Sequence, residues 1–70
     1  MIKLSELKES DKGRMVIYQP KGGGEGDRGK ISSWDDEFVF VNWEIYLGRY
    51  MDSFGCVPAA TSPEDLEWAG

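Results

Sequence analysis

The stretch that decides the fold is residues 37–43, Glu-Phe-Val-Phe-Val-Asn-Trp. β-Branched and aromatic residues fill it, and such residues pack well on a pleated sheet, so we predict a strand. Alternate side chains of a strand point to opposite faces. One face would carry Val39, Val41 and Trp43, and the other face would carry Phe38, Phe40 and Asn42. Because an unpartnered amide is costly in an apolar interior, we expect the first of these faces to line the core.

Two earlier strands are expected at residues 14–19 and 28–34. The first of them is again rich in β-branched and aromatic residues. Five of the nine glycines lie between positions 22 and 29, which predicts a polar loop between these strands. Residues 35–36, both aspartate, supply the turn into the next strand. Strands at this spacing indicate an antiparallel meander, and its core should also receive Val16, Tyr18 and Ile31.

Three other segments are less regular than the central strands. Residues 4–10 should form a short helical turn that is capped by Ser5 and stopped by Gly13. The spacing of apolar residues in 44–54 is compatible with a strand that continues past a bend, with a bulky loop, or with a short helix. Residues 55–61 should return as a short strand, which the proline in it confines to an edge or a bulge.

The chain should end with a second helical turn. Ser62 has the position of an N-cap and Pro63 that of the first helical residue. Leu66 and Trp68 have the spacing to press one face of this turn onto the body of the protein. Four or five short strands cannot make two full sheets, so a bent meander closed into a small barrel is the economical all-β arrangement.

Length and composition limit what this chain can be. Its 70 residues predict one domain, 1–70, and the 13% aromatic content argues against a disordered segment. A single cysteine and the absence of histidine leave no intrachain disulfide and remove the commonest zinc ligand. The net charge of −5 is uneven, because residues 1–30 carry seven basic and five acidic residues whereas residues 31–70 carry one and eight.

Four short motifs resemble those of small proteins encoded in phages and prophages, which usually have no assigned role. They are Gly13–Tyr18, Gly29–Ser33, Val39–Val41 and Ala60–Leu66. Their order also resembles SH3-like barrels of the Tudor and KOW kind. The resemblance implies a five-stranded SH3-like barrel with short helical turns at its ends. It implies little about activity, because that fold hosts peptide, protein and nucleic-acid binding alike.

None of the patterns typical of a catalytic or cofactor site is convincing. Residues 24–29 match G-x-G-x-x-G, but a strand follows them where a dinucleotide site needs a helix. Residues 35–37, three acids in a row, lack the alternation of a calcium loop and predict a solvated turn. Cys56 has no histidine to activate it and is expected to be an inert, buried thiol. We therefore expect no cofactor and no enzymatic activity.

Aromatic residues are the best candidates for a protein-binding site. If the outer face of the central strand is exposed, its aromatic pair would mark an interface with a host or phage protein, or with a second copy of the chain. The alternative is that the closing turn or residues 44–54 cover this face. The candidate protein-binding residues are Phe38, Phe40, Tyr46 and Tyr50.

Nucleic-acid binding is the rival prediction. Arg14, Arg28 and Lys30 could line a basic groove beside exposed aromatic rings, although the acidic balance of the chain weakens this interpretation. We expect no signal peptide at residues 1–12, and no apolar run is long enough to cross a bilayer. A lone thiol suits a reducing compartment, so we expect the cytoplasm of a bacterial host cell and no membrane partner.

Overall fold

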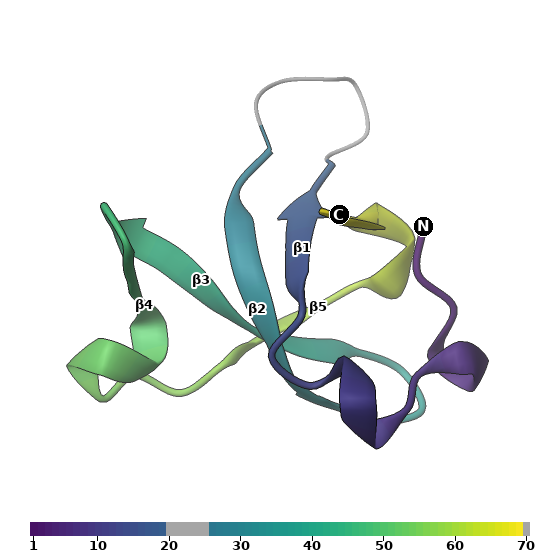
Figure 1. Ribbon diagram of the computed structural model, residues 1–70. Helices are drawn as coiled ribbons and strands as arrows, with labels where there is room; N and C mark the ends of the chain where they lie inside the picture. The colour runs from purple at the N-terminus through teal and green to yellow at the C-terminus, as the bar shows by residue number, and fades with distance from the viewer. Residues whose placement is uncertain (20–25, 70) are drawn as a thin grey trace.

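Three consecutive strands form an antiparallel meander at the centre of the molecule (Figure 1). The computed structural model describes residues 1–19 and 26–69. The strands are β1 (Met15–Tyr18), β2 (Arg28–Trp34) and β3 (Val39–Tyr46). The sequence predicted all three, and β3 begins two residues later and ends three residues later than expected.

Strand β3 is long enough to hold two different partners along its second edge. Its first half pairs with β5 (Ala59–Thr61), and its last residues pair with β4 (Arg49–Tyr50). The 3-10 turn η3 (Met51–Phe54) follows β4 directly. This resolves the three alternatives for residues 44–54, since the strand continues, turns back at Gly48, where φ is +72°, and ends in a single helical turn. We call residues 45–57 the hairpin arm (left of Figure 1).

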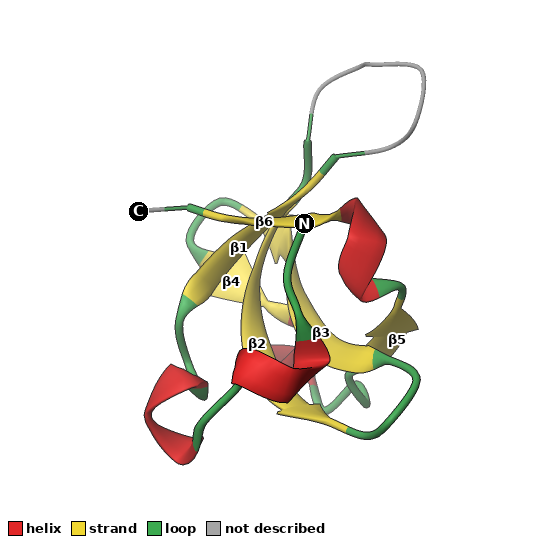
Figure 2. Ribbon diagram, turned by 90° about the vertical axis from the view of Figure 1, so that its right-hand side faces the viewer, coloured by secondary structure: helices red, strands yellow, loops and turns green. Residues whose placement is uncertain are grey.

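The chain crosses from one edge of the sheet to the other through a short turn. After β5 comes the 3-10 turn η4 (Pro63–Asp65), and then β6 (Leu66–Trp68), which pairs with β1. The sheet order is therefore β4-β3-β2-β1-β6, with β5 on β3, and Figure 2 shows the strands wrapped around a common interior.

One detail of the predicted C-terminal turn was wrong, whereas Ser62 and Pro63 lie at the predicted N-cap and first positions of η4. Leu66 and Trp68 belong to a strand, because residues two apart both face the interior in a strand and β1 offers backbone partners for pairing. Ser62 has the N-cap position, but its side chain makes no capping hydrogen bond. The strand expected over residues 55–61 is shorter than predicted and begins at Ala59, directly after Pro58, which lacks the backbone N–H that a strand pair uses.

Two 3-10 turns, η1 (Leu4–Glu6) and η2 (Glu9–Asp11), replace the single helical turn expected near the N-terminus. The N-cap of η1 is Lys3, so the prediction that Ser5 caps this turn was wrong. The Asp11 carboxylate closes η2 by accepting the backbone N–H of Lys8 at 3.0 Å.

The core lies on one face of the wrapped sheet. Its buried apolar residues are Ile2, Val16, Ile31, Val39, Val41 and Leu66. The partly buried residues packed against it are Leu4, Leu7, Tyr18, Trp34, Trp43 and Trp68. The predicted core positions are therefore confirmed, with Tyr18 and Trp43 at its margin. Gly29 allows this packing, because a Cβ at that position would lie 2.7 Å from Cε3 of Trp43.

Candidate docking surface

The four aromatic residues predicted to bind a protein do not form one surface. Phe38 precedes β3 and is 39% exposed, whereas Tyr46 ends β3 and is 70% exposed. The two residues are eight positions apart along extended chain, which is about 26 Å at the rise of a β-strand. A compact interface could use one end of the strand or the other.

Phe40 and Tyr50 are both half-buried. The ring centroid of Tyr50 lies 4.4 Å from the Nζ atom of Lys30 on β2, and the hydroxyl of Tyr50 donates to the Sδ atom of Met15 on β1 at 3.6 Å. Because these contacts occupy both the ring and its hydroxyl, we assign Tyr50 to the attachment of the hairpin arm to the sheet.

The side-chain amide of Asn42 is buried near the place where the hairpin arm contacts the sheet. Asn42 lies opposite Lys30 in the pairing of β2 with β3, on the outer face as predicted, yet it is only 9% exposed. Its Oδ1 atom has no hydrogen-bond partner within the described part of the chain. Turn η3 packs against β3. Together with the position of Tyr50, this packing shows that the arm covers the outer face around Lys30 and Asn42, whereas Phe38 is exposed.

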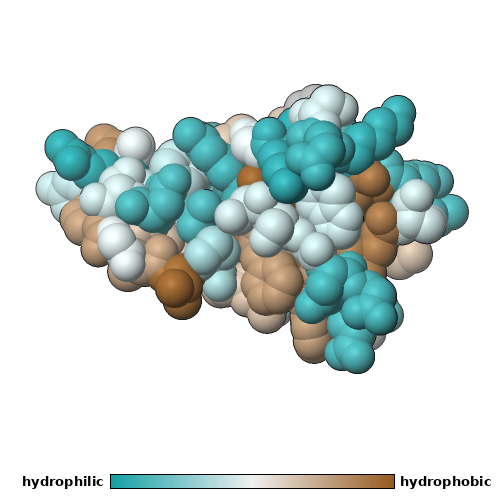
Figure 3. Space-filling view, turned by 90° about the horizontal axis from the view of Figure 1, so that it is seen from below, coloured by the Kyte–Doolittle hydropathy of each residue, from teal (hydrophilic) through white to brown (hydrophobic). Residues whose placement is uncertain are grey.

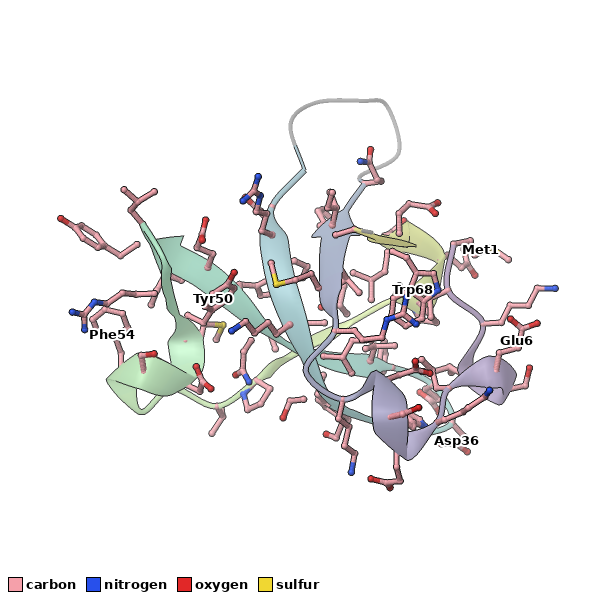
Figure 4. The ribbon with its side chains drawn as sticks, viewed as in Figure 1. Met1, Glu6, Asp36, Tyr50, Phe54 and Trp68 are labelled. Atoms are coloured by element: carbon pink, nitrogen blue, oxygen red, sulfur yellow. The ribbon has the colours of Figure 1, made fainter. Side chains whose placement is uncertain are left out.

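The hairpin arm presents most of the exposed large apolar side chains. Leu47 is 91% exposed and Val57 is 79% exposed. We call the exposed apolar residues of this segment the apolar arm surface, and they are Ile45, Tyr46, Leu47, Phe54 and Val57. Phe54 lies at the outer end of the arm in Figure 4, and Figure 3 shows apolar side chains reaching the surface at the same end of the molecule.

Single exposed apolar residues are normal on soluble proteins, but their concentration on one projecting segment is typical of an interaction site. Sequence reasoning found only Tyr46 of this set. The available signal was a run of apolar residues without polar alternation next to Gly48, inside the segment whose structure the sequence left open.

The basic residues predicted to bind nucleic acid do not converge. Lys30 pairs with Met15, so it leaves β2 on the outer face, and Arg28, two residues earlier, leaves on the same face. Arg14 lies two residues before the core residue Val16 and therefore belongs to the opposite side of the sheet.

Arg14 is also engaged within the molecule. It donates to the Asp11 carboxylate at 3.0 Å, and its guanidinium carbon lies 3.9 Å from the ring centroid of Trp68. The hydrogen bond from Arg14, with that from the Lys8 backbone, holds the pKa of Asp11 below its ordinary value. A basic groove built on all three predicted residues would need Arg14 to leave these partners.

The minor motifs also have structural explanations. In residues 35–37, the Oδ1 atom of Asp35 accepts the backbone N–H groups of Glu37 and Phe38 at 2.8 and 2.7 Å, which closes the turn between β2 and β3. The expectation that Cys56 is buried was wrong, because it lies in the arm and is exposed. Residues 24–25 of the G-x-G-x-x-G match lie outside the described residues, and its last two residues are in β2.

Across residues 1–19 and 26–69, no group of three acidic or cysteine side chains is placed to hold a metal ion. The same residues include no helix that is long and apolar enough to cross a membrane. No protein-family model matches the chain, and no curated protein or solved structure matches it either. The resemblance to small phage proteins therefore stays a prediction.

Proposed function

We propose that this chain is a non-enzymatic interaction module that docks on a protein partner through the apolar arm surface. The observation that carries the proposal is the exposure of five large apolar side chains on a segment of thirteen residues. The arm is also held in place, because Tyr50 contacts Lys30 and Met15 on the sheet. A positioned segment loses less conformational entropy on binding than a free loop, which favours docking.

We further propose that the sheet is an SH3-like barrel. The supporting features are the meander β1-β2-β3, the position of β5 on β3, and the turn η4 that leads into β6 beside β1. Since such barrels bind many kinds of partner, the function rests on the exposed residues and not on the fold.

The proposed partner is a protein of the phage or of its bacterial host, as the resemblance implies, and a second copy of the chain is the other protein partner considered. The apolar arm surface favours a protein over a nucleic acid. A nucleic-acid site would need convergent cations, and Arg14 faces away from Arg28 and Lys30.

Capture from a nuclease-treated bacterial lysate tests this proposal. The tagged chain is compared with a Leu47→Ser/Val57→Ser variant and with Phe38→Ser, which alters an exposed apolar residue outside the arm. We expect one captured protein that the double variant loses and the Phe38→Ser variant keeps. Equal capture by all three proteins, loss with Phe38→Ser alone, or capture that requires intact nucleic acid would contradict the proposal.

A further inference from the structure

A cavity of about 340 Å³ opens at the margin of the core, and none of the apolar arm surface lines it. Two aromatic residues and two aspartates line it, together with β5 and Ser62. The rings belong to Tyr18 and Trp43, whose centroids are 6.0 Å apart at an interplanar angle of 80°. The aspartates are Asp27 and Asp65.

Backbone hydrogen bonds place the two acidic residues at the end of β1. The N–H of Tyr18 donates to the carbonyl of Asp27 at 2.9 Å, and the N–H of Gln19 donates to the carbonyl of Asp65 at 2.6 Å. In the described part of the chain, neither aspartate side chain has a hydrogen bond or an ion pair. The cavity therefore combines aromatic walls with two acidic residues that no cation of the described part of the chain neutralises.

The same molecule holds two cations between a tryptophan and a carboxylate, and the arginine lies closer to its ring than the lysine does. Lys12, paired with Glu9, is 5.8 Å from the ring centroid of Trp34. Arg14 lies with its guanidinium 3.9 Å from the ring centroid of Trp68 while it donates to the carboxylate of Asp11. A tryptophan and an aspartate together engage one guanidinium there. The cavity also combines a tryptophan, Trp43, with aspartates, Asp27 and Asp65, but no arginine lines it.

We propose that this cavity binds an arginine side chain of a partner protein. A guanidinium is planar and weakly hydrated, so it can stack on an indole ring while its N–H groups reach carboxylates on more than one side. The net charge of −5, concentrated in residues 31–70, would steer a basic partner toward this chain. This site goes beyond the apolar arm surface and does not depend on it.

A titration followed by NMR tests the proposal on the intact chain. The probe is the peptide Gly-Gly-Arg-Gly-Gly, and the control peptide carries citrulline, the neutral isostere of arginine, at the same position. We expect the indole N–H signal of Trp43 to shift with the arginine peptide while the signals of Trp34 and Trp68 stay in place, since those two rings already have cations against them. A third peptide carries lysine at that position and should bind more weakly. An equal shift with citrulline, an equal affinity for the lysine peptide, or no shift at Trp43 would overturn the assignment.

Charge variants locate the site. Asp27→Asn and Asp65→Asn should each weaken binding of the arginine peptide by about two- to five-fold, the range for partly exposed ion pairs. Asp36→Asn removes the same charge from the turn between β2 and β3 (Figure 4) and should leave the affinity unchanged. Equal weakening by all three variants would show that net charge and not the cavity attracts the peptide, and would overturn the proposal.

Discussion

At the scale of single residues, Asp35 shows how one side chain sets a turn. Its carboxylate accepts two backbone N–H groups, that of Phe38 and that of Glu37, and these bonds hold its pKa below the ordinary value of 3.8. A carboxyl group whose pKa is lowered in the folded state contributes stability above its unfolded pKa. That contribution is lost as the pH falls through the folded pKa.

Asp35→Asn should therefore lower the melting temperature at neutral pH. The difference from the parent protein should shrink as the pH falls from 3.8 through the lower pKa of the folded state, because the carboxyl group of the folded parent then becomes protonated and is uncharged, like the asparagine amide. Thermal unfolding followed by circular dichroism over a series of pH values measures both effects. Asp36→Asn is the matched control and should change little, and a pH-independent difference between Asp35→Asn and the parent would refute the role given to this carboxylate.

The environment of Asn42 predicts how its substitution changes the free energy of unfolding. Its buried Oδ1 atom lacks a partner among the described residues, and such an atom costs free energy. Asn42→Leu, which has a similar shape, should raise the free energy of unfolding by about 1 kcal/mol. Urea unfolding measures the change. Asn42→Asp should lower the stability because it places a charge there, and a loss of stability with leucine would mean that the amide is needed.

At the scale of elements, local sequence predicted those parts that local interactions determine. Strand β2 has the predicted bounds, and the Asp35–Asp36 turn follows from side-chain hydrogen bonds to nearby backbone. The sequence could not assign Leu66–Trp68 to a strand, because the residues that pair with it lie about fifty positions earlier in β1. The sequence could not decide the structure of the hairpin arm for the same reason, because contacts with the distant strands β1 and β2 hold the arm in place.

Tyr50 should control the mobility of the arm without controlling the fold. Tyr50→Ala removes the ring from Lys30 and the hydroxyl from Met15, so the amide protons of Gly55 and Cys56, which are hydrogen-bonded within the arm, should exchange roughly ten-fold faster. Hydrogen exchange followed by NMR measures this rate, with Tyr50→Phe as the variant that keeps the ring. Equal acceleration of the β1 and β2 amides would show that Tyr50 supports the whole sheet instead.

At the scale of the whole molecule, stability depends on pairing the last strand of the chain, β6, with the first, β1. A chain of this size rarely gains more than about 5 kcal/mol from its core. Leu66 is fully buried where β6 meets β1, so Leu66→Ala should cost about 2–5 kcal/mol and unfold much of the population. Leu47→Ala, the same change at an exposed site, should stay within about 0.5 kcal/mol. Similar urea midpoints for both variants would contradict this account of the core.

The apolar arm surface also depends on the arrangement of the whole molecule, and the sequence predicted it only in part. Exposed aromatic residues were expected to bind a protein, and Tyr46 does lie on the apolar arm surface. Its neighbours could not be identified, because exposure depends on how far the arm projects and not on residue type. The cavity between Tyr18 and Trp43 was equally hidden, since η4 and β5 complete it from the other end of the chain.

The most direct test of the docking proposal is a photo-crosslink from the arm. A photoreactive amino acid replaces Leu47 in one sample and Asp36, exposed in the turn between β2 and β3, in the control. Both proteins are irradiated in nuclease-treated bacterial lysate, and the crosslinked species are identified by mass spectrometry. We predict one crosslinked protein from position 47 and none from position 36. The same products from both positions, or none from position 47, would contradict docking through the arm.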